Sequence, residues 1–193
     1  MRRPLMFLAQ SNGVVELLAG DVPAAEREFH TAVDLALEIG ERDEISCTGA
    51  RLSLILRAQG RSDEAANLAA LSTRTAPSES VAAQALSLTA QARGLAEKGD
   101  YPAAEALARQ AVDLAPSEML TLRADLLVEL AEVLRAADGQ RAAREALDEA
   151  VRLYEHKGNI VAAGRVTRGA GTDSSPIRLP KAGDHNGLHE RAE

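Results

Sequence analysis

The chain contains very few aromatic residues and a single cysteine. Its 193 residues include no Trp, two Phe and two Tyr, namely Phe7, Phe29, Tyr101 and Tyr154. Aromatic and β-branched residues favour strands, whereas Ala, which makes up about a fifth of this chain, favours helices. The composition therefore predicts an all-α fold. A lone Cys47 provides no disulfide framework and no cysteine-based zinc site, which is typical of a reducing compartment.

Basic surface and long apolar segments are also missing. The formal net charge is −7, and residues 168–193 contribute four positive and four negative groups, so the excess negative charge lies before them. Because binding to phosphates needs a basic patch, we expect no nucleic-acid partner. No apolar run reaches the ~20 residues of a membrane span, and the apolar stretch after Arg3 stops at Gln10, too early for a signal peptide. We expect a cytoplasmic protein that does not cross a membrane.

The most informative feature is a seven-residue sequence segment that occurs twice. The segment GDVPAAE at 20–26 returns as GDYPAAE at 99–105, and each copy continues into AVDLA, at 32–36 and 111–115. Weaker copies of the turn lie at 60–66 and 138–144, and APSE at 76–79 recurs at 115–118. The turns thus fall at 20, 60, 99 and 138, a period of 39 to 40 residues. Self-similarity at this period indicates an array of repeats.

Apolar residues at helical spacing predict a helix on each side of every turn. Gly20 is suited to end the first helix and Asp21 to cap the second. Pro77 breaks the chain and Ser78 caps the helix after it, while Pro116 and Ser117 open the next. The expected helices cover 3–18, 21 to about 40, 43–59, 62–73, 78–98, 101–114, 117–137 and 140–156, with a short cap helix over 160–166. Residues 169–193 have the composition of a disordered tail.

The spacing of small and large residues in the second helix of each pair resembles the tetratricopeptide repeat (TPR) family. That family places a small residue, a large residue and Ala along this helix, often followed by Pro. The resemblance implies an α-solenoid of four helical pairs and a cap over residues 1–168. Two departures stand out, because the first-helix Trp of the family is missing and each unit is five or six residues longer than usual. The matching triplets are Ala25, Phe29 and Ala32; Ala65, Ala69 and Ser72; Ala104, Ala108 and Ala111; and Ala143, Leu147 and Ala150.

The last unit carries a narrower resemblance. Residues 130–135, 145–150 and 153–163 look like the C-terminal repeats of large bacterial signalling proteins, which join a nucleotide cyclase or a winged-helix regulator to an ATPase module. This resemblance implies that the chain is only the regulatory arm of such a protein, and it leaves three origins open: a separately encoded remnant, a misplaced start codon, or a natural small relative.

Motifs for catalysis or cofactor binding are not found in the sequence. No Gly-x-x-x-x-Gly-Lys-Ser/Thr segment is present, and the glycine-rich stretch 169–175 follows no strand. His185 and His189 have a spacing that suits a metal only within a helix, which the intervening Asn186-Gly187 disfavours. We expect Cys47 to be a packing residue. The sequence predicts a protein that is not an enzyme and that binds no metal or cofactor.

Surface residues remain as the candidate site. In the TPR family the first helices line a concave groove that binds protein or peptide partners, so the resemblance implies a partner-binding groove that is basic in the middle and acidic toward the end. Two other interpretations stay open: ordinary solvated helix surface, and a groove that senses a small molecule or nucleotide. The polar residues that project onto this groove are Gln10, Arg51, Arg57, Arg93, Glu129, Glu132 and Arg135.

The first helix raises a separate expectation. If the array starts near Met1, no preceding unit covers the outer side of the segment from Arg2 to Ala19. We therefore expect either self-association through this helix or a missing upstream segment.

Overall fold

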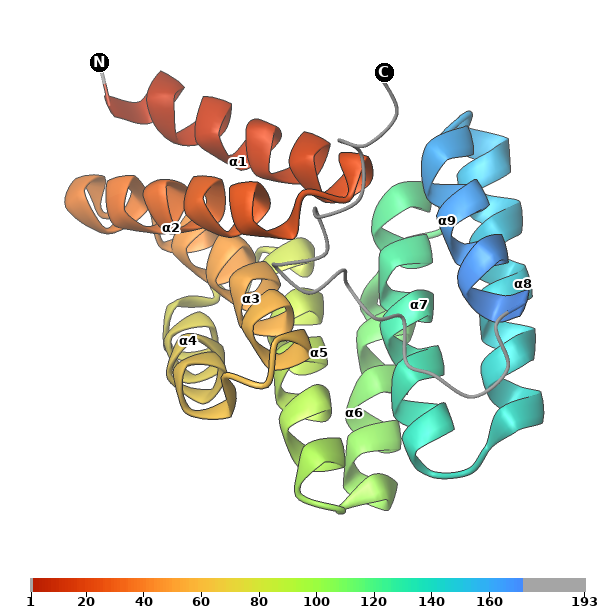
Figure 1. The fold of residues 1–193 in the computed structure, drawn as a ribbon. Helices are drawn as coiled ribbons and strands as arrows, with labels where there is room; N and C mark the ends of the chain where they lie inside the picture. The colour runs from red at the N-terminus through yellow and green to blue at the C-terminus, as the bar shows by residue number, and fades with distance from the viewer. Residues whose placement is uncertain (1, 172–193) are drawn as a thin grey trace, which may run out of the picture.

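The computed structural model describes residues 2–171, with side chains through Gly169, and every regular element in this range is an α-helix (Figure 1). The all-α prediction is confirmed. The helices of the described chain are, in order, α1 Arg2–Ala19, α2 Val22–Ile39, α3 Arg42–Ala58, α4 Ser62–Thr75, α5 Val81–Glu97, α6 Tyr101–Leu114, α7 Leu120–Ala136, α8 Gln140–Lys157 and α9 Ile160–Gly171.

The helical pairs recur at a constant interval. The first helices α1, α3, α5, α7 and α9 begin at residues 2, 42, 81, 120 and 160, so successive starts are 40, 39, 39 and 40 residues apart. The turn within each of the first three pairs contains a glycine with positive φ, at Gly20, Gly60 and Gly99. Asp138 takes this conformation in the fourth pair, with φ 59°. The sequence period is thus a period of helical pairs.

N-terminal capping explains why the repeated segment, at 20–26 and 99–105, starts a helix. Asp21 accepts a hydrogen bond from Ala24 N at 2.9 Å, and Asp100 accepts one from Ala103 N at 3.3 Å. Each aspartate therefore satisfies an amide of the first helical turn that has no partner within the helix. The proline that follows each cap lies in the first turn, where its missing N–H costs nothing.

Two expected helix starts were wrong, both after a proline. Ser80 rather than Ser78 caps α5, and α7 begins at Leu120 rather than at residue 117. In both places the chain first makes a turn, closed by hydrogen bonds from Ser80 N to the carbonyl of Pro77 and from Met119 N to that of Pro116. The last helix differs as well, since α9 extends to Gly171, three residues into the expected tail. The rest of that segment, 172–193, lies outside the described residues.

Neighbouring helices pack in a regular order. Each second helix lies against the first helix of its own pair and against the first helix of the next, as α2 does with α1 and α3. The first helices also contact one another directly, α3 with α5 and α5 with α7. Contacts between neighbouring units are therefore made both by the second helices and by the first helices α3, α5 and α7.

Small residues let these helices approach closely. Ala25, Ala65, Ala104 and Ala143, which occupy the same place in the four second helices, are at most 1% exposed. The position of the large residue is buried in every unit, although Phe29 fills it only in the first. In the first unit α1 packs closely against the Phe29 ring. A Cβ added at Gly13 would lie only 3.0 Å from a carbon of this ring.

The two ends of the described chain meet. A guanidinium nitrogen of Arg165 in α9 donates a hydrogen bond to the carbonyl of Leu17 in α1, and Leu18 packs against the core cluster that runs from α3 to α9. Figure 1 shows the C-terminal end of α1 on the side of α7 and α9. The packed helices thus curve enough to bring residues 148 positions apart into contact. None of the described helices is sufficiently long and apolar to cross a membrane.

Candidate functional site

All seven candidate groove residues lie on first helices. Gln10 is on α1, Arg51 and Arg57 are on α3, Arg93 is on α5, and the remaining three follow one another along α7. The structure brings them together in four groups of contacts between different helices. We refer to the surface of the first helices that carries these seven residues as the inner face.

Gln10 joins α1 to α3. Its amide nitrogen donates hydrogen bonds to Glu44 Oε2 at 2.7 Å and to Thr48 Oγ1 at 3.2 Å. Burial raises the pKa of Glu44, and the hydrogen bond from Gln10 opposes that rise by favouring the ionised carboxylate. Beside this contact lies an open hollow of about 280 Å³, lined by Gln10, Ser11, Val14 and Arg51.

Arg51 reaches past α5 to α7. Its Nη2 lies 3.9 Å from Asp125 Oδ2, and Asp125 Oδ1 accepts a hydrogen bond of 2.5 Å from the Tyr154 hydroxyl on α8. Burial raises the pKa of Asp125, while Tyr154 and Arg51 both stabilise its charged form. A residue of α3 is therefore linked electrostatically to both helices of the fourth pair.

Arg57 is the most buried of the predicted residues. Its side chain is 8% exposed and pairs with Glu97 at the end of α5, which also accepts a hydrogen bond from Ser62. Burial lowers the pKa of Arg57, and the neighbouring positive charge of Arg93 lowers it further. This arginine is an element of the α3–α5 interface rather than solvated surface.

Arg93 connects α5 to the acidic part of α7. Its Nε lies 3.3 Å from Glu129 Oε2 and its Nη1 lies 4.0 Å from Glu132 Oε2. Glu132 also pairs with Arg135 at 2.8 Å, one helical turn further along α7. Burial raises the pKa of Glu129, which Arg93 opposes and the nearby Glu132 and Asp125 reinforce.

Two guanidinium groups keep a free donor on this face. Arg57 Nε and Arg93 Nε are buried and have no hydrogen-bond partner among the described residues. Although Arg93 Nε is within ion-pair distance of Glu129, their alignment does not make a hydrogen bond. A buried donor without a partner is costly, and because both atoms are buried, a ligand or a water molecule reaches them only when neighbouring side chains move.

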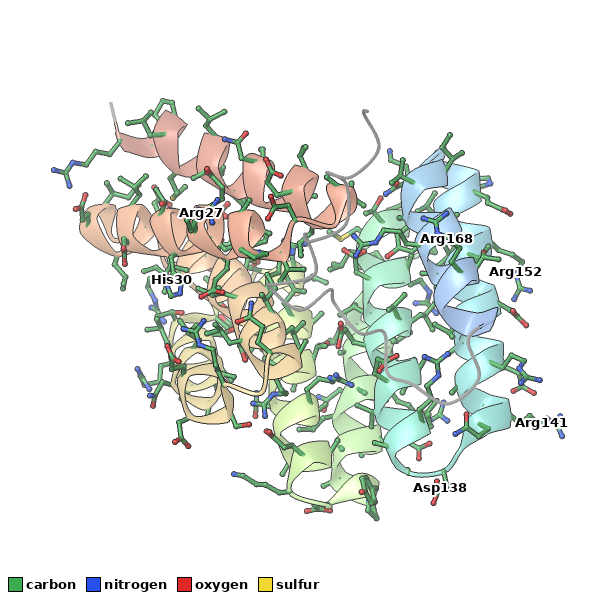
Figure 2. All side chains as sticks on the ribbon, viewed as in Figure 1. Arg27, His30, Asp138, Arg141, Arg152 and Arg168 are labelled. Carbon is green, nitrogen blue, oxygen red and sulfur yellow. The ribbon has the colours of Figure 1, made fainter. Side chains whose placement is uncertain are left out.

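Charges on the second helices behave differently. Arg141 and Arg152 point outward from α8 (Figure 2) and pair within that helix, with Glu145 and Glu149 respectively. Such exposed pairs contribute little to stability. On the inner face, by contrast, three of the four arginines pair with a different helix, which makes it the chemically distinctive surface of the described chain.

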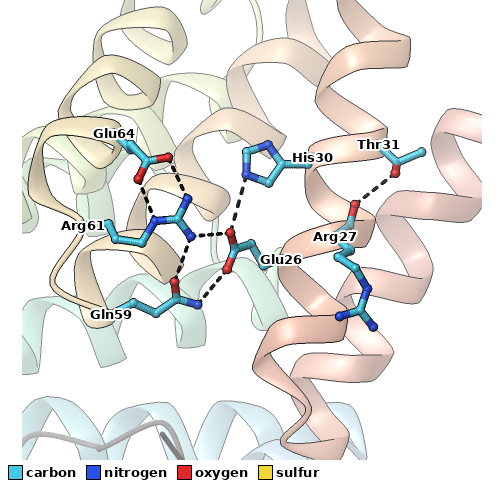
Figure 3. A network of polar contacts seen from close by, with 7 residues as sticks. All are labelled: Glu26, Arg27, His30, Thr31, Gln59, Arg61 and Glu64. Carbon is cyan, nitrogen blue, oxygen red and sulfur yellow. Dashed lines mark hydrogen bonds and ion pairs between the residues drawn. The ribbon is translucent and has the colours of Figure 1, made fainter. Parts of the chain in front are cut away.

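One network on the second-helix side does join two units. Glu26 of α2 accepts hydrogen bonds from Gln59 at 2.9 Å and Arg61 at 2.5 Å, and lies 3.7 Å from His30 (Figure 3). Arg61 also binds Glu64 in its own helix. Burial acts to raise the pKa of Glu26, but these hydrogen bonds outweigh it and leave that pKa below its ordinary value. The network fastens the first unit to the second.

Sequence reasoning missed several partners of the predicted residues. Asp125 lies four and seven residues before Glu129 and Glu132, so its helical spacing would have placed it on the same face of α7. Tyr154 lies on the buried side of α8, and a buried tyrosine hydroxyl needs a hydrogen-bond partner. No comparable signal in the sequence indicates Glu44, Thr48 or Glu97.

Other candidate chemistry is limited. Among the described residues, no three His, Cys, Asp or Glu side chains are grouped closely enough to hold a metal ion. Cys47 is buried, and this burial raises its pKa to about 12. His185, His189 and most of the glycine-rich stretch 169–175 lie outside the described residues.

Comparison with known proteins adds no relative. No family model matches the chain, and no curated protein or solved structure shows significant similarity to it. The sequence pattern and the geometry of the inner face are therefore the observations that indicate a function.

Proposed function

We propose that the chain is a TPR-like α-solenoid of four helical pairs with a terminal cap helix, and that it is a non-catalytic module for binding a protein or peptide in the cytoplasm. The observation that carries this proposal is the inner face, where arginines and carboxylates of α3, α5 and α7 pair between helices and two buried Nε–H groups stay unsatisfied. The helical period of 39 to 40 residues supports the solenoid assignment.

An extended peptide suits this surface better than a compact ligand. The charged groups follow one another over three first helices, so a ligand that contacts all of them must itself be elongated. A peptide also supplies both kinds of partner that the face needs, since its carbonyl and carboxylate oxygens accept from Arg51 and Arg93, which keep part of their side chains exposed, and its basic side chains pair with Glu129 or Asp125.

A peptide library displayed on phage tests the binding function. We expect sequences enriched on the wild-type protein to lose binding to Arg93→Gln, which removes the charge but keeps a polar side chain on the inner face. Arg152→Gln is the matched control, because Arg152 stands on the outer side of α8 and is 66% exposed. No enriched sequence, or equal loss with both variants, would contradict the proposal.

We also propose that the module is the regulatory arm of a bacterial signalling ATPase, cyclase or transcription regulator, or a remnant of one. The resemblance of the last unit supports this. The genomic DNA in frame before the Met1 codon provides the test. An open frame that encodes a Walker-type ATPase is the expected result, and a stop codon close by would instead favour a free-standing adaptor.

A second candidate function is the sensing of a small molecule or nucleotide. The hollow of about 280 Å³ beside Gln10, Ser11, Val14 and Arg51 favours it, because one cationic and two neutral polar groups converge there. A ligand that binds only the folded state must raise the melting temperature. A thermal-shift screen of metabolites, repeated on Arg51→Gln, separates this function from peptide binding, since only a small-molecule sensor gives hits that this substitution removes.

A further inference from the structure

The outer side of α1 is an apolar surface that nothing covers among the described residues. Leu5, Leu8 and Val15 are 53%, 56% and 61% exposed, although large aliphatic side chains are normally buried. The opposite side of the same helix is buried, with Met6, Ala9 and Gly13 inward. An exposed contiguous patch of this kind marks an interaction site.

The exposed residues follow the pattern of a coiled-coil seam. Leu5, Leu8, Asn12, Val15 and Ala19 succeed one another at intervals of three and four, as positions a and d of a heptad do, and all five are exposed. Asn12 stands at an a position near the middle of the helix. Residues at this spacing are therefore suited to packing against another helix, rather than against a lipid or a flat protein surface.

The charges of α1 indicate which helix fits. Arg2 and Arg3 lie in its first turn and Glu16 in its last, and the twelve residues between them carry no charge. Arg2 and Arg3 pair with Glu38 and Glu41 of the same chain, but their side chains stay 60% and 64% exposed and can also meet a carboxylate of a second copy. The two ends are about 21 Å apart, given a rise of 1.5 Å per residue. Two copies of α1 placed antiparallel therefore bring Arg2 of each copy near Glu16 of the other, whereas a parallel pair would place like charges side by side. Arg2 and Glu16 both occupy e positions of the heptad, which flank the seam.

We propose that the chain forms a two-fold symmetric dimer through antiparallel packing of α1 against α1 of a second copy. Leu5 of one copy then meets Val15 of the other, and Leu8 meets Asn12. The contact is isologous, so it closes at two subunits and does not grow into a filament. It goes beyond the proposed peptide binding and is independent of it, because Gln10, the candidate groove residue of α1, occupies an f position on the side opposite the seam.

Sedimentation equilibrium of the 193-residue protein, from low to several hundred micromolar, tests the dimer. We expect a concentration-dependent mass that approaches twice 20.4 kDa. Leu8→Glu should weaken association at least roughly tenfold, because it places two carboxylates in the seam, and should leave the helical circular dichroism unchanged, because Leu8 is exposed. Ile160→Glu is the matched control on α9, where Ile160 is 75% exposed, and should still dimerise.

Charge reversal tests the antiparallel orientation. Arg2→Glu alone and Glu16→Arg alone each create two repulsive pairs in their own dimers, and both should associate more weakly than the wild type. An equimolar mixture of the two variants should regain wild-type association, because both pairs in the mixed dimer are then attractive. A 20.4 kDa mass at every concentration would overturn the proposal and leave this face to an upstream segment or another protein. A dimer that Ile160→Glu breaks, or that mixing does not restore, would overturn it as well.

Discussion

Removing the Tyr154 hydroxyl tests whether the contact between α7 and α8 on the inner face is structural. Tyr154→Phe deletes the 2.5 Å hydrogen bond to Asp125 and leaves the apolar packing of the ring in place. A hydrogen bond to a charged group contributes about 1.5–3 kcal/mol when it is buried. Asp125 keeps 38% of its side-chain surface exposed, so water replaces part of the lost interaction and we expect a loss of about 1–2 kcal/mol. The melting temperature should fall by roughly 2–6 °C.

The pH dependence of this loss is the more specific test. Burial raises the pKa of Asp125, so the folded state holds its proton more tightly than the unfolded state and stability falls as pH rises through the window between the two pKa values. Without Tyr154 the folded pKa rises further and that fall becomes steeper. Urea unfolding should therefore show a small difference between variant and wild type below the unfolded pKa of Asp, about 3.9, and the full difference at neutral pH.

A matched control is available for this substitution. Tyr101→Phe removes the hydroxyl of the other tyrosine, which is 37% exposed and makes no hydrogen bond with the described residues. It should leave the free energy of unfolding unchanged at every pH. Equal losses in both variants, or a loss in Tyr154→Phe that does not vary with pH, would refute the role assigned to Asp125.

Three further predictions concern individual side chains. Glu129→Gln should flatten the decrease in the free energy of unfolding that follows as the pH rises above the ordinary pKa of Glu, about 4.3, measured with urea, because burial raises the pKa of this carboxyl and the amide carries no charge. Gly13→Ala gains about 1 kcal/mol of helix propensity but crowds the Phe29 ring at a cost of about 1–3 kcal/mol, so calorimetry should show lower stability, and a double-mutant cycle with Phe29→Leu should show coupling. Cys47, with its pKa raised to about 12, should react with a thiol reagent at pH 8 only after unfolding, and rapid labelling of the native protein would contradict its burial.

The positions of the helices could be predicted from sequence because the signals are local. Gly20, Asp21 and Pro23 lie within four residues of one another, and together they mark the end of one helix and the start of the next. The two wrong starts, after Pro77 and Pro116, also have a local reason. A Ser that follows Pro can either cap a helix or occupy a turn, and the hydrogen bond that closes the turn decides between them.

The partners of the inner-face residues could not be predicted, because they depend on the curvature of the array. Arg51 and Asp125 are 74 positions apart, and Arg165 and Leu17 are 148 apart. Whether such residues meet depends on the small rotation that each helical pair adds, and that rotation is the summed result of packing at many Ala-lined contacts. The sequence indicated which face would be polar, and the structure shows that its charges largely neutralise one another.

This pairing affects how the inner face must be tested. In a repeat array, stability is approximately a sum over the units and the interfaces between neighbours. The pairs Arg57–Glu97 and Arg93–Glu129 lie at the α3–α5 and α5–α7 interfaces, so each arginine that can hold a ligand also joins two helices. Arg57→Glu would bury two repelling carboxylates and separate the helices whether or not a ligand binds there. Substitution by Gln leaves a hydrogen-bond donor and adds no repulsion, so a loss of binding by the Gln variant with unchanged unfolding identifies a ligand contact.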